Sequence, residues 1–242
     1  MTEKTPSLKE KLESSKKYLP NADLQGADLE GADLAGATLT GSDLRGANLK
    51  KIFLSDSKIS KSNLTGADLT GANLSGADLN KSNLGKANLQ NAYLRRADLR
   101  GANLSETNLT KSNLRECALF KAWFKKSDCS GATMQNIKGA QSNMQGCILV
   151  GAKMAGADLT GARLERANLE DACLQTANLN RAFLNDTNLN RTDLRGANLR
   201  YVAGLTREQV KLARIDKNTL MPDYLKVKWT SQSAFDILDV EK

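Results

Sequence analysis

A leucine-centred motif recurs every five residues through most of the chain, as in NADLQGADLEGADLAGATLTGSDLRGANLK. The centres run from Leu24 to Leu199 without a slip in register, which makes 36 consecutive units. Leucine occupies 29 centres, and the others are Ile59, Phe124, Cys129, Met134, Gly139, Met144 and Met154. A period of five fits neither the 3.6 residues of a helical turn nor the two-residue repeat of a strand. The chain is therefore expected to coil as a succession of turns.

The positions around each centre have their own chemistry. Two positions before it stands Ala, Ser, Thr or Cys in 34 units, with Ile52 and Ile137 as the exceptions. The residue just before the centre is mostly Asp or Asn, and the residue two after it is Gly or polar, which is typical of turns. One large and one small side chain per unit are thus predicted to point inward. Gly139 has no side chain to place in the core. We interpret Ile137, which is larger than the usual residue at its position, as filling the volume of the missing leucine.

The repeat A(D/N)LxX, present as Ala67-Asp68-Leu69-Thr70-Gly71 and as Ala102-Asn103-Leu104-Ser105-Glu106, resembles the motif of the pentapeptide-repeat family. The resemblance implies an all-β fold. This fold is a right-handed quadrilateral β-helix with one unit per side, four units per coil and the central leucines stacked inside. The array would then form about nine coils and, at about 4.8 Å per coil, a rod on the order of 43 Å long.

The sequence divides into four expected segments: a helical cap at 1–20, the β-helix at 21–202, a second helical cap at 203–225 and a tail at 226–242. Ser7-Leu8-Lys9-Glu10 is a capping-box pattern that predicts a helix to about Tyr18. Thr206-Arg207-Glu208-Gln209 predicts the start of the second helix. Caps are expected at both ends because an open coil would expose backbone groups and apolar core.

Two segments follow the second helix. The first, DKNTLMPDYL, resembles a flank that follows bacterial pentapeptide arrays, and we assign its Asp216, Thr219 and Pro222 a capping role. The second, KVKWTSQSAFDILDVEK, carries apolar residues at Val227, Trp229 and beyond. It is expected either to pack on its own rod or to dock on a partner.

The residues that most enzymes use are missing or poorly placed. The chain has no histidine, so Ser-His-Asp and Cys-His arrangements are excluded. Its four cysteines contain no CxxC pair, and we expect reduced thiols with no metal and no cofactor. The Asp residues of the array are predicted to face solvent, where carboxyl groups keep ordinary acidity. We therefore expect no enzymatic activity. The sequence has no signal-peptide core and no long apolar stretch, so a cytoplasmic protein without a membrane span is expected.

One face of the predicted rod is basic. Residues twenty apart share a face, and the face whose centres include Leu39, Leu99 and Leu199 carries a net charge of +5, against +1, −2 and +1 on the others. Its candidate binding residues, with Lys121 beside them, are Lys58, Lys61, Lys81, Arg100, Lys138, Arg181 and Arg200. They either keep the rod soluble or bind nucleic-acid phosphates or another anionic surface.

Two aromatic residues, Phe120 and Trp123, occupy outward positions in the irregular stretch 117–149. Lys121, Lys125 and Lys126 stand next to them. Outward rings beside lysines are typical of an interaction hot spot or a base-stacking platform. The alternative is that the rings cover a local bulge of the coil.

The function that these features favour is a rigid, non-enzymatic scaffold of bacterial or organellar type that binds another protein, whose identity the sequence does not give. The capped ends predict a monomer. A nucleic-acid or anionic-surface binder that uses the basic face is the alternative. A DNA mimic that engages DNA gyrase, as the resemblance to quinolone-resistance members implies, is less favoured. This chain has a net charge of +8, no loop insertions in its array and a C-terminal end that looks capped.

Overall fold

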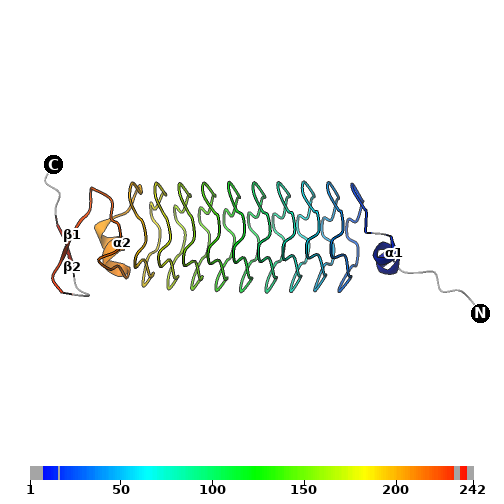
Figure 1. Ribbon diagram of the computed structural model, residues 1–242, viewed down its shortest axis with the longest axis horizontal. Helices are drawn as coiled ribbons and strands as arrows, with labels where there is room; N and C mark the ends of the chain where they lie inside the picture. The colour runs from blue at the N-terminus through cyan, green and yellow to red at the C-terminus, as the bar shows by residue number, and fades with distance from the viewer. Residues whose placement is uncertain (1–7, 16, 232–234, 239–242) are drawn as a thin grey trace, which may run out of the picture.

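The protein is a straight rod of stacked coils (Figure 1). The computed structural model describes residues 8–15, 17–231 and 235–238. Helix α1 (Leu8–Ser14) lies at one end of the rod. Helix α2 (Arg207–Leu212) and strands β1 (Lys226–Trp229) and β2 (Phe235–Leu238) lie at the other.

Parallel backbone pairing joins each coil to the next at a spacing of twenty residues. Asp23 pairs with Asp43, and Asn63 pairs with Asn83 in the same column. In nearly every unit the N–H of the central residue donates forward along the rod, as from Leu64 to the carbonyl of Asn83 at 2.7 Å. Four units therefore complete one turn of the coil, and the predicted β-helix is confirmed.

The corners between units are tight turns. At Gly66 φ is +66°, in the left-handed region that glycine adopts without strain, and Lys81 takes the same region with a φ of +57°. The carboxylate or amide before each centre supports the turn: Asp68 Oδ1 accepts the N–H of Thr70 at 3.0 Å. The outward Asp and Asn residues thus have a structural role as side-chain acceptors, which explains their recurrence.

The core is a continuous stack of the repeat centres and the small residues that precede them. Leu64 and Leu99 are fully buried, and the centres Phe124, Met134 and Met144 of the irregular stretch are buried equally well. Burial of one leucine stabilises the fold by roughly 2 kcal/mol before entropy is counted. The changes of residue type in that stretch are thus accommodated without a break in the stack.

Gly139 is the one repeat centre without a side chain. A Cβ added to it would lie 3.5 Å from Cδ1 of Ile137 and 3.3 Å from Cδ2 of Leu159. Ile137 is buried. The space that a leucine would fill is thus taken by Ile137, in agreement with the interpretation from sequence.

At the N-terminal end, side chains of α1 pair with backbone groups of the first coil. Glu13 Oε1 accepts the N–H of Asp33 at 2.9 Å, and Lys9 Nζ donates to the carbonyl of Glu30 at 2.8 Å. The predicted extension of this helix to about Tyr18 is wrong, since Tyr18 already pairs with Thr38 in the ladder of the rod. The start predicted at Ser7 lies outside the described residues.

At the C-terminal end, residues after the array take the place of a further coil. Thr206 begins α2 with a capping box to Gln209, whose amide also donates to the carbonyls of Leu184 and Thr187. Arg214 and Leu220 pair with Asp193 and Asn198, twenty-one and twenty-two residues earlier.

Two residues of the flank singled out in the sequence bond to the last coil. Asp216 Oδ1 accepts the N–H of Gly196 at 2.9 Å, and Thr219 Oγ1 donates to the carbonyl of Leu194 at 3.1 Å. The backbone of this coil therefore has partners beyond its own units.

The tail forms an antiparallel hairpin, which the sequence analysis did not anticipate. β1 and β2 pair with Val227 opposite Ile237 and Trp229 opposite Phe235, and the last two rings lie 5.4 Å apart between centroids. All four side chains are half-buried against the core cluster. Of the two roles considered for the tail, packing on its own rod is the one seen in these residues.

Candidate interaction surfaces

The corner patch, which we define as Phe120, Lys121, Trp123, Lys125 and Lys126, spans two adjacent faces of the rod. Phe120 ends one side of a coil and Trp123 begins the next, with the corner between them. Their side chains are 41% and 56% exposed. Trp123 pairs in regular register with Asn103 and Asn143, so there is no bulge here for the rings to cover.

The lysines of the corner patch extend the two rings with positive charge. Lys121 Nζ lies 5.0 Å from the centroid of Phe120, within the range of a cation–π interaction. Lys125 and Lys126 make no ion pair with any residue that the structure describes. The structure therefore places the five predicted patch residues along one side of a coil, with Phe120 and Lys121 at the corner where it begins and Lys125 and Lys126 at the corner where it ends.

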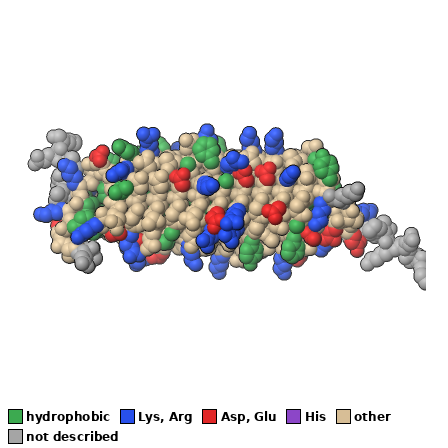
Figure 2. Space-filling view, in the orientation of Figure 1, with side chains coloured by type: hydrophobic (Ala, Val, Ile, Leu, Met, Phe, Trp, Pro, Cys, Tyr) green, Lys and Arg blue, Asp and Glu red, His purple; other side chains and the backbone are tan. Residues whose placement is uncertain are grey.

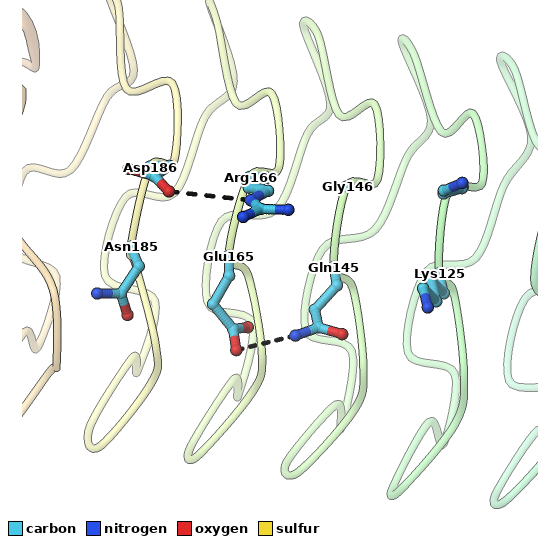
Figure 3. Close-up of a pocket in the computed structure, with 8 residues that line it drawn as sticks. Lys125, Gln145, Gly146, Glu165, Arg166, Asn185 and Asp186 are labelled. Carbon is cyan, nitrogen blue, oxygen red and sulfur yellow. Dashed lines mark hydrogen bonds and ion pairs between the residues drawn. The ribbon is translucent and has the colours of Figure 1, made fainter.

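A surface hollow of about 510 Å³ adjoins the patch and runs along the rod at the corner of Lys125 and Lys126 (Figure 3). Lys125 and Lys126 form one end, and Asp186 paired with Arg166 forms the other. Between them, Glu165 accepts a hydrogen bond from Gln145 Nε2 at 3.0 Å, while its second carboxylate oxygen has no hydrogen-bond partner among the residues that the structure describes. This hollow was not predicted from the five-residue pattern, because its lining comes from four coils and its residues are related only by steps of twenty.

The basic face predicted from the sequence divides into paired and unpaired cations. Burial opposes ionisation of Asp98, but hydrogen bonds from the Arg100 side chain and backbone hold its pKa below the ordinary value. Arg100 is therefore partly neutralised by its ion pair with Asp98. Among the described residues, no ion pair is made by Lys58, Lys61, Lys81, Lys138, Arg181 or Arg200. Lysine and arginine side chains project from both long edges of the view in Figure 2.

Groups with catalytic or metal-binding chemistry do not gather in the described part of the chain. No cluster of three or more Cys, Asp or Glu side chains there could hold a metal ion. Burial raises the pKa of the Cys117 thiol to about 12, which disfavours the nucleophilic thiolate. Cys129 and Cys147 are buried with their sulfur atoms 3.8 Å apart. None of the described helices has the length and apolar character needed to cross a membrane.

Comparisons with known proteins agree on the architecture. The family model for pentapeptide repeats matches residues 19–56, 54–85, 87–125, 140–175 and 172–202. One similar structure is HetL, a pentapeptide repeat protein involved in heterocyst differentiation regulation from the cyanobacterium Nostoc. It is 30% identical over 90% of this chain and 98% of its own, with a TM-score of 0.49.

A trypsin-treated form of QnrB1, a plasmid-mediated fluoroquinolone resistance protein, is 16% identical over 74% of this chain and 89% of its own. Its TM-score is 0.50. A comparison with curated proteins found no match. Since the family model covers more than half of the residues, the chain belongs to the pentapeptide-repeat family, whose fold is the right-handed quadrilateral β-helix.

Proposed function

We propose that this protein is a non-enzymatic rigid scaffold that binds another protein through the corner patch. The observation that supports this most strongly is the exposure of Phe120 and Trp123 at one corner of a rod whose other outward positions are mostly polar. Aromatic residues are enriched among the few side chains that dominate binding energy. The backbones of both residues are bonded to the preceding coil, so little backbone entropy is lost on binding.

The lysines of the corner patch set the chemistry of the partner. Lys125 and Lys126 make no ion pair within the described chain and follow Trp123 at the end of the same side of the coil. A surface with an apolar anchor and flanking carboxylates complements this arrangement. Complementary charge speeds encounter and fixes orientation, while the rings supply most of the affinity.

The proposal includes a finite, monomeric rod of about nine coils in which α1 and the segment 203–225 act as caps. The bonds from Glu13 to the first coil and from Thr219 to the last support this role, because they pair backbone groups that a neighbouring molecule would otherwise reach. The free, mostly buried cysteines suit a reducing compartment, and we place the protein in the cytoplasm.

The test is quantitative capture of a partner from extracts of the source cell, followed by affinity measurement with the purified partner. The double variant Phe120→Ala/Trp123→Ala is expected to weaken binding by about 2 kcal/mol or more. Its melting temperature should stay near that of the wild type, because both rings are exposed. Phe183→Ala is the matched control, since this ring is 42% exposed in the same column as Trp123. Undiminished binding by the folded double variant would refute the corner patch.

The basic face supports a second candidate function, binding of nucleic acid or another anionic surface. The specific observation is the run of unpaired cations that includes Lys58, Lys81 and Lys138. Phosphate contacts would make affinity fall steeply with salt, whereas binding through the two rings would change little. A triple change of these lysines to Gln should then abolish binding and leave the corner-patch partner bound. A role as a DNA mimic remains the least favoured alternative, since the chain carries a net charge of +8.

A further inference from the structure

A second pair of exposed rings stands in a single column on the side of the rod opposite Trp123. In the ladder Asn73 pairs with Phe53 on one side and with Tyr93 on the other. The backbones of Phe53 and Tyr93 are therefore two coil spacings apart, with the coil of Asn73 between them. They are 50% and 56% exposed. Their column lies two sides of the four-sided coil away from that of Trp123, so it is separate from the corner patch.

The two rings are the walls of a shallow slot. Its volume is about 330 Å³, near the lower end of the ~300–1,000 Å³ found for ligand pockets. We define the aromatic slot by its lining residues, which are Lys51, Phe53, Gly71, Asn73, Ser75 and Tyr93. A site of this size takes one side chain of a larger molecule.

The backbones that carry the two walls are far enough apart to leave room for one aromatic ring between them. Neighbouring coils are about 4.8 Å apart, so the backbones that carry Phe53 and Tyr93 are about 9.6 Å apart. A flat ring inserted midway would lie about 4.8 Å along the rod from the backbone of each wall residue. That offset lies inside the 4.5–7 Å centroid range that aromatic pairs prefer. The rigid ladder fixes this spacing before any ligand binds.

The floor of the aromatic slot offers a hydrogen-bond donor. Asn73 Oδ1 accepts the N–H of Ser75 at 3.1 Å, whereas its Nδ2 has no partner among the described residues. Elsewhere such an amide reaches the preceding coil, as Asn103 Nδ2 does to Asn83 Oδ1 at 3.0 Å. In this column both neighbours of Asn73 are rings, so its amide is left to bind an oxygen of a ligand.

The rim carries one cation. Lys51 lies along Gly71, with its Cγ 3.6 Å from the point where a Cβ of Gly71 would be, and it makes no ion pair with a described residue. A single unpaired ammonium fits one carboxylate. Polynucleotide binding would call for a series of cations along the phosphates, which the lining of the slot does not supply.

We infer that the aromatic slot binds a partner peptide that places an aromatic side chain between Phe53 and Tyr93 and an adjacent acidic side chain on Lys51. A backbone carbonyl of the same peptide accepts from Asn73 Nδ2. The slot and the corner patch lie on opposite sides of the rod, so the two sites can be occupied together. Either site can be lost without the other.

The test is a magnetic-resonance titration of the isotope-labelled full chain with a capped peptide that has one tryptophan between two aspartates. We expect saturable shifts of the Asn73 side-chain amide and of the Ser75 backbone amide. Phe53→Ala/Tyr93→Ala should weaken binding about tenfold, as expected for the loss of two stacking contacts. The control Phe120→Ala/Trp123→Ala should bind this peptide normally, which separates failure of the slot from failure of the proposed function.

Two further measurements make the result decisive. Lys51→Gln should lower the affinity for the aspartate peptide several-fold. It should leave the affinity for an otherwise identical peptide with asparagine in place of aspartate unchanged. A peptide with alanine in place of tryptophan should not shift Asn73. The inference is overturned if the slot variants bind as well as the wild type, if Asn73 does not respond, or if a single-stranded oligothymidine occupies the slot more tightly than the peptide.

Discussion

At the scale of single residues, the core has a compensating pair in Ile137 and Gly139. We predict that Ile137→Ala lowers the free energy of unfolding by about 2–5 kcal/mol, because it opens a cavity. Gly139→Leu alone should cost about 1–3 kcal/mol, because Ile137 and Leu159 already fill that space. The double variant restores the usual small and large residues and should recover most of the loss. Urea denaturation measures this cycle, and simply additive losses would show that the two positions do not compensate.

Cys117 gives a prediction about alkaline pH. Burial raises its pKa in the folded chain from about 9 to about 12. The folded state therefore favours the neutral thiol, and the stability that this contributes is present below about pH 9 and is lost as the pH rises toward 12. Cys117→Ala places the commonest small residue at this position and removes the titration. The stability of the wild type relative to this variant should fall across that range, and a constant difference would contradict the burial of the thiol.

At the scale of elements, Thr219 tests the C-terminal cap. Its hydroxyl donates to the carbonyl of Leu194 and accepts the N–H of Asp216. Thr219→Val keeps the shape and leaves both groups without this partner, so a loss of about 1–3 kcal/mol is expected. Hydrogen exchange should speed up in the last coil, at the amide of Gly196, and stay unchanged in the first. Thr133→Val, at a mid-array position whose hydroxyl makes no hydrogen bond among the described residues, is the control. Equal effects of the two changes would argue against a cap.

The elements differ in how far the sequence could predict them. The coils follow from the five-residue period, and α2 follows from the capping box at Thr206. The end of α1 was misplaced because ladder pairing of Tyr18 with Thr38 outweighs local helix signals. The hairpin of β1 and β2 was missed because its strands are short and no Asn-Gly or Asp-Gly turn marks their connection.

The surface sites also differ in how far the sequence could predict them. Local spacing predicted the exposure of Phe120 and Trp123, since both stand at outward positions of adjacent units. The aromatic slot depends on Phe53 and Tyr93, which are forty residues apart in sequence and meet only through coiling. Five-residue patterns do not reveal such pairs, whereas aligning the sequence at twenty-residue steps does.

At the scale of the whole molecule, the paired ends predict a monomer in solution. Backbone groups of the first and last coils already bond to residues outside the array. Edge-to-edge stacking of rods is therefore disfavoured. Light scattering at several concentrations should give the mass of one chain, 26.2 kDa. A stable dimer formed through residues 205–242 would show instead that this end is an interface.

The positions of the corner patch, the basic face and the aromatic slot all depend on four units completing one coil. Pulsed electron-resonance distances between spin labels test this most directly, in a Cys173→Ala background that retains only the buried cysteines. Asn48, Asn168 and Asn188 lie in one column. The label pair at 48 and 168 should be about 29 Å apart, and moving the second label to 188 should add about 4.8 Å. Distances that do not grow by one coil spacing per twenty residues would contradict the assignment of every face.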